Sequence, residues 1–137
     1  YTFVTSLSDL FAESDFISLH LPSNDQTRGV VNSELLSRMK GGAYLVNTAR
    51  GDLINEDDLA TALKERQIGG AALDVFADEP PREDSPFLEL DNVLLTPHVA
   101  SLTREVTVKA AVGAAQAVAD FADGKTPQFV VNREVLD

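Results

Sequence analysis

The feature that most constrains the fold is a series of short, continuous apolar runs with helix-like segments between them. The runs lie at residues 16–20, 43–47, 70–75 and 92–98. Their apolar residues are consecutive, which is typical of strands buried on both faces of a parallel sheet. The sequence therefore predicts an α/β fold with a parallel sheet covered by helices on both faces. A further strand is expected at residues 1–4, where polar and apolar residues alternate.

Helices are predicted between the apolar runs, each from a polar N-cap followed by an apolar stripe. They lie at residues 6–14, 32–42, 55–69 and 103–123. The last is rich in alanine and its apolar residues extend almost all round the helix. We therefore expect it to pack closely against more than one neighbour.

Composition restricts the possible functions. The chain has 137 residues, a net charge of −11, no cysteine and two histidines. This negative charge argues against nucleic acid and anionic membranes as partners, because both require basic patches. The cysteine and histidine counts argue against disulfides and a zinc site. No apolar run has the roughly 20 residues of a membrane span. No secretory signal is visible, so we expect a cytoplasmic protein.

Polar residues follow the predicted strands at their carboxyl ends. His20 follows the first strand, Arg50 the second, Asp74 and Glu79 the third, and His98 the fourth. Ligands of open parallel sheets bind outside the carboxyl ends of the strands. The last four of these residues are therefore expected to gather at one edge of the sheet, where they form a candidate site.

The residue types at this edge suit an anionic carbonyl or hydroxyl substrate. The planar fork of Arg50 matches a carboxylate, and His98 can transfer a proton near neutral pH. A carboxylate such as Glu79 beside that histidine would fix its tautomer and stabilise the imidazolium. The set offers no nucleophile, so hydride transfer with a bound cofactor fits better than acyl transfer. Gly51 is expected to let the loop turn tightly behind Arg50.

Each of these residues also has a simpler interpretation. Arg50 can be a solvated arginine at a strand end, and His98 a structural histidine. Glu79 lies in an acidic loop, and Asp74 can serve only to cap the start of a loop. His20 is more often structural than chemical in such a position.

Four motifs occur in order along the chain: "HLP", "NTARG", "AALDVFADEP" and "TPHVAS". Together they resemble the D-isomer-specific 2-hydroxyacid dehydrogenases, and the resemblance covers essentially the whole chain. It implies that Arg50 holds the substrate carboxylate, that His98 is the general acid/base, and that Glu79 is its partner. It implies in addition that Asp74 contacts the nicotinamide carboxamide.

The resemblance also implies a cofactor, NAD or NADP, and a set of residues that bind it. Those on the adenosine side are His20, Leu21, Pro22 and Thr27. Those near the nicotinamide are Thr48, Ala49 and Ser101. The implied reaction converts a small 2-keto acid to a D-2-hydroxy acid or the reverse. The motifs "NTARG" and "VNREVL" favour a phosphoglycerate-like substrate, and a homodimer is implied.

The sequence departs from the family in one respect. No three of its eight glycines fit the phosphate-binding pattern G-x-G-x-x-G. We therefore expect a fragment, a partial Rossmann-type sheet that lacks the first phosphate-binding half. In this division residues 1–102 are the C-terminal half of a dinucleotide-binding domain, and residues 103–137 lead back to a substrate domain.

Two other functions remain open. The chain can be a non-catalytic module that serves in dimerisation or weak nucleotide binding. It can also derive from a degenerate dehydrogenase used as a transcriptional corepressor. The intact Arg50, Glu79 and His98 argue against the latter.

Overall fold

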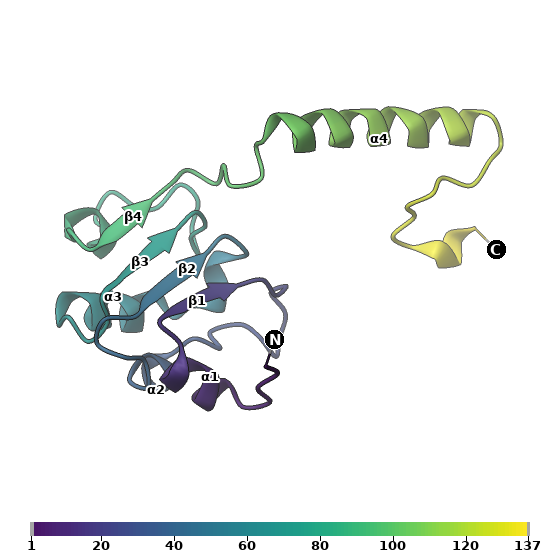
Figure 1. Ribbon diagram of the computed structural model, residues 1–137. Coiled ribbons are helices and arrows are strands. Elements are labelled where there is room, and N and C mark those ends of the chain that lie inside the picture. Colours follow the sequence, from purple (N-terminus) through teal and green to yellow (C-terminus); the bar gives the residue numbers. More distant parts are fainter. Residues whose placement is uncertain (1, 137) are drawn as a thin grey trace. The chain divides into compact units, whose positions relative to one another are not determined.

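The computed structural model describes residues 2–136 (Figure 1). It divides into two compact units, one ending at Ala100 and one beginning at Ser101. Each unit is described by itself.

The first unit is built on a four-stranded parallel sheet in which the strands lie in chain order. All three strand pairs are parallel, and Phe16, Tyr44 and Gly70 lie opposite one another in register. The predicted parallel α/β fold is confirmed. The strands are β1 (Phe16–Leu19), β2 (Tyr44–Asn47), β3 (Gly70–Leu73) and β4 (Val93–Leu95).

Three helices precede or connect the strands. They are α1 (Leu7–Glu13), α2 (Ser33–Leu36) and α3 (Glu56–Lys64), and 3-10 turns occur at η1 (Gly51–Leu53) and η2 (Pro86–Glu89). Side chains of Ser6, Asn32 and Asn55 accept hydrogen bonds from backbone N–H groups of the first turns, as the capping pattern predicts. Helix α3 ends before the predicted Gly69, because Arg66 adopts a left-handed conformation with φ of 57°.

The predicted strand at residues 1–4 is wrong where the structure describes it. Residues 2–4 have no regular secondary structure, and residue 1 lies outside the described residues. The physical reason is that β1 is an edge strand paired with β2 only, and this segment pairs with neither. An extended segment without a hydrogen-bonded neighbouring strand is not stabilised as a strand by the alternation of its polar and apolar residues.

Within the first unit, helices cover one face of the sheet (Figure 1), and the second covered face that the sequence predicts is not found in this unit. Consecutive parallel strands joined by right-handed crossovers place α2 and α3 on the same side, and α1 lies there too (Figure 1). Residues facing these helices, such as Leu45, are buried. On the other face Phe16 is 74%, Tyr44 45% and Leu94 65% exposed.

The second unit contains helix α4 (Arg104–Ala122), capped by Thr103, and the 3-10 turn η3 (Arg133–Val135). No residue of α4 is buried, so the close packing predicted for this helix is not found. The rest of its own unit, up to residue 136, supplies one short turn and irregular backbone, which cannot cover an alanine-rich helix. Over the described residues, no helix is long and apolar enough to cross a membrane.

Candidate active site

His98 and Glu79 form a direct contact beyond the carboxyl ends of β3 and β4. The distance from His98 Nδ1 to Glu79 Oε2 is 2.8 Å. The other carboxylate oxygen of Glu79 accepts a hydrogen bond of 3.1 Å from the Phe76 N–H. The hydrogen bond with His98, and then that from Phe76, lowers the pKa of Glu79 below its ordinary value despite partial burial. A charged carboxylate on Nδ1 suits a histidine that exchanges a proton at Nε2.

Buried Asp74 holds the loop that carries His98. Its Oδ1 accepts from the Thr96 hydroxyl at 2.5 Å and from the Val99 N–H at 2.9 Å, and its Oδ2 accepts from the Ala100 N–H at 2.9 Å. His98 itself has a φ of 54°, a conformation that costs free energy in a residue other than glycine. Asp74 stabilises this loop on both sides of the histidine.

The charge on Asp74 is favoured by these contacts. Burial by itself would raise the pKa of this carboxyl. The hydrogen bonds from Thr96, Ala100 and Val99 outweigh burial, and the pKa lies below its ordinary value. Both carboxylate oxygens are engaged within the protein, so the nicotinamide contact implied for Asp74 stays a prediction.

The loop that carries Arg50 is held by Asn47, which is fully buried at the end of β2. Its side-chain amide donates to the Arg50 carbonyl oxygen at 2.8 Å, and its Oδ1 accepts from the Ala49 N–H at 3.0 Å. The Arg50 guanidinium is exposed and donates to the Ala49 carbonyl oxygen at 2.6 Å. Sequence reasoning gave Asn47 no role, although an amide at the end of an apolar run was a signal.

Gly51 brings the Arg50 loop against the loop that carries Glu79. A Cβ atom on Gly51 would lie 1.9 Å from the carbonyl carbon of Phe76 and 2.4 Å from the Ala77 nitrogen. The predicted reason for this glycine, a tight turn, is therefore replaced by close approach of two backbones. The Arg50 loop, which follows β2, therefore lies against the Glu79 loop, which follows β3.

The residues predicted for the adenosine side form a loop after β1. His20 Nε2 lies 2.8 Å from the Ser18 hydroxyl, and Leu21 packs against the core. The Thr27 hydroxyl donates to the Pro22 carbonyl oxygen at 2.7 Å. These contacts order the loop, and its role in cofactor binding stays a prediction.

The residues predicted near the nicotinamide belong to two units. Thr48 is exposed just past β2, and Ala49 packs against the core. Ser101 is the first residue of the second unit. A cavity of about 310 Å³ lies on the first unit beside the His98–Glu79 pair. It is lined by Phe76, Glu79, Pro80, Pro81, Pro97 and His98.

The sequence pattern of the NAD-binding domain of D-isomer specific 2-hydroxyacid dehydrogenases matches residues 1–100. The chain belongs to this dehydrogenase family. A glyoxylate reductase from Aeropyrum pernix is 47% identical over 131 residues, which cover 96% of the chain. A D-3-phosphoglycerate dehydrogenase from Synechocystis is 44% identical over 129 residues, which cover 94%.

Solved structures of dehydrogenases and reductases have the same fold. D-lactate dehydrogenase with NAD+ from Lactobacillus jensenii has a TM-score of 0.86 at 28% identity, covering 94% of the chain and 43% of that protein. An acyclic imino acid reductase in complex with NADPH and D-Arg has a TM-score of 0.83 at 35% identity, covering 93% and 40%. The chain spans 39% of the Aeropyrum relative and 23% of the Synechocystis relative.

Proposed function

We propose that this chain is part of an oxidoreductase that transfers a hydride between a nicotinamide cofactor and a D-2-hydroxy acid or its 2-keto acid. The observation that carries the proposal is the His98–Glu79 contact at the carboxyl edge of the sheet. Family membership supports the reaction class. The exposed Arg50 on the adjoining loop supports an anionic substrate.

In the proposed reaction His98 donates a proton from Nε2 to the oxygen at C2 of the keto acid and takes it back in the reverse direction. Glu79 holds Nδ1 and stabilises the imidazolium. Arg50 binds the substrate carboxylate with its planar fork, exchanging its present contact with the Ala49 carbonyl oxygen for that ligand.

The edge residues fit the nicotinamide end of NAD or NADP better than the pyrophosphate. Exposed Thr48 and the cavity beside His98 support a nicotinamide site next to the proton donor. The bound cofactor would supply the hydride for C2. The glycine-rich phosphate loop is absent from the sequence, so the pyrophosphate would be held by other parts of the protein.

We also propose that residues 1–102 are the C-terminal half of a dinucleotide-binding domain and that residues 103–137 lead to a substrate domain. The exposed apolar side chains on the open face of the sheet, Phe16 and Leu94, support a larger domain that covers them. The division between units near Ala100 supports the boundary. A homodimer of the whole protein and a cytoplasmic location are further parts of this proposal.

The proposed substrate pair is phosphoglycerate-like, a D-2-hydroxy acid such as 3-phosphoglycerate and its 2-keto acid, or the corresponding pair with hydroxypyruvate. The Synechocystis relative, a D-3-phosphoglycerate dehydrogenase, supports this choice, and the Aeropyrum relative makes glyoxylate the first competitor. Phosphohydroxypyruvate, hydroxypyruvate and glyoxylate each carry a carboxylate next to a carbonyl at C2. These acids therefore differ only in what lies beyond C2.

The test uses the longer protein that contains this chain, with phosphohydroxypyruvate, hydroxypyruvate and glyoxylate and either NADH or NADPH. We expect turnover of at least one acid. His98→Ala should lower kcat by roughly 10²–10⁴-fold, and Arg50→Ala should mainly lower kcat/KM. The control Arg38→Ala removes another exposed arginine and should change neither. Normal turnover in both site variants would contradict the assignment.

A second candidate applies to the 137-residue chain alone. Because its sequence lacks the glycine-rich loop, the isolated chain would be a non-catalytic module that dimerises or binds nucleotide weakly. Turnover, NADH fluorescence titration and sedimentation of this polypeptide test that function. Efficient turnover by the isolated chain would exclude it.

A further inference from the structure

Three contacts hold the backbone at Phe76 and Ala77. Glu56, the first residue of α3, accepts a hydrogen bond of 2.8 Å from the Ala77 N–H through Oε1. Gly51 lies against the peptide between Phe76 and Ala77 so closely that a Cβ would overlap it. The Phe76 N–H donates to Glu79 Oε1. The two successive N–H groups of Phe76 and Ala77 therefore join the carboxylate that contacts His98 to the start of α3.

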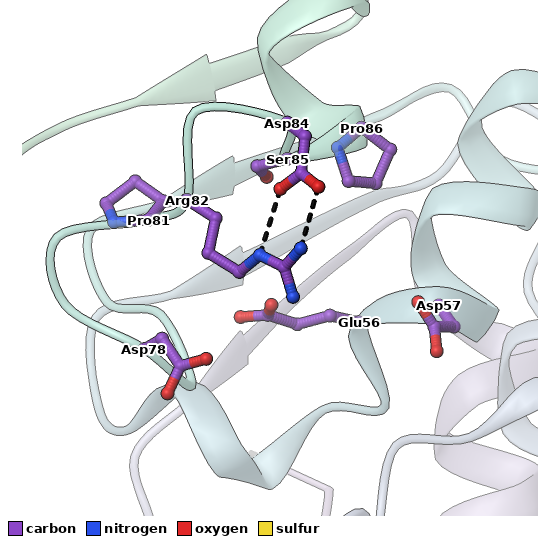
Figure 2. Close-up of a pocket in the computed structure, with 8 residues that line it drawn as sticks. All are labelled: Glu56, Asp57, Asp78, Pro81, Arg82, Asp84, Ser85 and Pro86. Atoms are coloured by element: carbon purple, nitrogen blue, oxygen red, sulfur yellow. Dashed lines mark hydrogen bonds and ion pairs between the residues drawn. The ribbon is translucent and has the colours of Figure 1, made fainter.

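A second cavity, of about 320 Å³, lies beside Glu56. Its lining includes Glu56, Asp57 and Arg82. Figure 2 shows the Glu56 carboxylate extending toward Asp78 and the Arg82 guanidinium. Arg82 donates to both carboxylate oxygens of Asp84, at 2.9 and 2.7 Å. The Arg82 guanidinium therefore pairs with Asp84, whereas the hydrogen-bond partner of the Glu56 carboxylate is the backbone N–H of Ala77.

We propose that Glu56 is a positioning residue for Glu79 and, through it, for His98. The inference rests on the proposed hydride transfer for its catalytic consequence. The turn from Phe76 to Glu79 is short, so the place of the Ala77 N–H fixes where the Glu79 carboxylate can lie. That carboxylate must reach the Phe76 N–H and His98 Nδ1 together.

Removing the acceptor should loosen this arrangement. In Glu56→Ala the Ala77 N–H loses its partner, while the Gly51 contact and the hydrogen bond from Phe76 to Glu79 stay in place. The charged groups that face Glu79 are His98 and Asp74. A weaker contact with His98 should bring the pKa of Glu79 back toward its ordinary value, because that contact is the largest cause of its lowering.

The experiment compares three variants in the longer protein: Glu56→Ala, Glu56→Gln and Asp57→Ala. Glutamine keeps an oxygen that can accept from the Ala77 N–H. Asp57→Ala removes a neighbouring carboxylate from the same helix turn and serves as the control. The readouts are kcat and KM, the pH titration of the Glu79 carboxyl by ¹³C NMR, and the affinity for NADH.

We expect Glu56→Ala to lower kcat roughly 10–100-fold, as displacement of a catalytic group does. The Glu79 titration should move to higher pH, while the NADH affinity stays unchanged. Glu56→Gln should restore most of kcat and the titration, and Asp57→Ala should resemble the wild type. A Glu79 titration that is the same in Glu56→Ala and the wild type would overturn the proposal, as would a Gln variant as impaired as the Ala variant.

The NMR titration separates this proposal from the proposed function. If the wild-type protein turns over no 2-keto acid, the hydride-transfer assignment fails, whereas the titration still reports whether Glu56 positions Glu79. If turnover is normal and the titration does not move, the positioning role alone is wrong.

Discussion

The body of the sheet and its carboxyl edge are stabilised by different kinds of interaction. In the body, apolar side chains such as Leu45, Leu59 and Leu63 have no exposed surface and pack between the strands and α3. At the edge, Asn47 and Asp74 are buried and bind backbone groups of the following loops. Burial of apolar surface has no preferred direction, whereas each hydrogen bond fixes a particular atom. The body therefore determines the fold, and the edge determines the positions of the candidate catalytic groups.

The largest expected effect is on the body. Leu45→Ala should lower the free energy of unfolding by about 2–5 kcal/mol, because it leaves a cavity in the core. Leu94→Ala, on the open face of the same sheet, should change it by no more than about 0.5 kcal/mol. Urea denaturation followed by circular dichroism measures both. Equal losses in the two variants would remove the contrast between covered and open faces.

A smaller effect on stability is expected at the edge, accompanied by a loss of activity. Asp74→Asn replaces an oxygen that accepts from a backbone N–H by an amide, which should cost about 1–3 kcal/mol. The loop around His98 should relax from its left-handed conformation, so kcat should fall in the longer protein. Asp78→Asn makes the same change at an exposed carboxyl in the loop that carries Glu79 and serves as the control. An Asp74 variant with wild-type kcat would show that the edge does not position His98.

The smallest expected effect concerns pH. Because the pKa of Asp74 and of Glu79 lies below the ordinary values of 3.8 and 4.5, the unfolded state binds more protons in acid. Their contribution to stability is present above about pH 5 and is lost as the pH falls through the lower folded-state values. Urea midpoints between pH 7 and pH 3 measure this loss, and Asp74→Asn should reduce it. An Asp74 variant with the wild-type pH dependence would show that the contribution comes from other groups.

Much of the body could be predicted from the sequence because its signals are local. The apolar runs and the caps Asn32 and Asn55 gave the four strands and the starts of the three helices of the first unit. The ends of two helices were predicted too late, because α2 ends at Leu36 and α3 at Lys64, before the predicted glycines. Burial could not be predicted equally well. Continuous apolar runs indicate that a strand can be buried on both faces, but they do not supply the second layer, so Phe16 and Leu94 are exposed.

The edge was less predictable because its contacts join residues far apart in the chain. The order of the strands predicted that Glu79 and His98 would lie near each other, and their contact is observed. The close approach of Gly51 to Phe76, and the hydrogen bond from Ala77 to Glu56, leave no pattern in the local sequence. The catalytic roles themselves remain predictions that kinetics must test.

The central claim is that Glu79 acts through His98, and a double-mutant cycle on kcat/KM tests it most directly. The cycle compares Glu79→Gln, His98→Ala and the double variant in the longer protein, with the most active 2-keto acid as substrate. Groups that act as a unit are strongly non-additive. We predict that the double variant is no slower than His98→Ala alone. A double variant whose loss equals the product of the two single losses would contradict the claim.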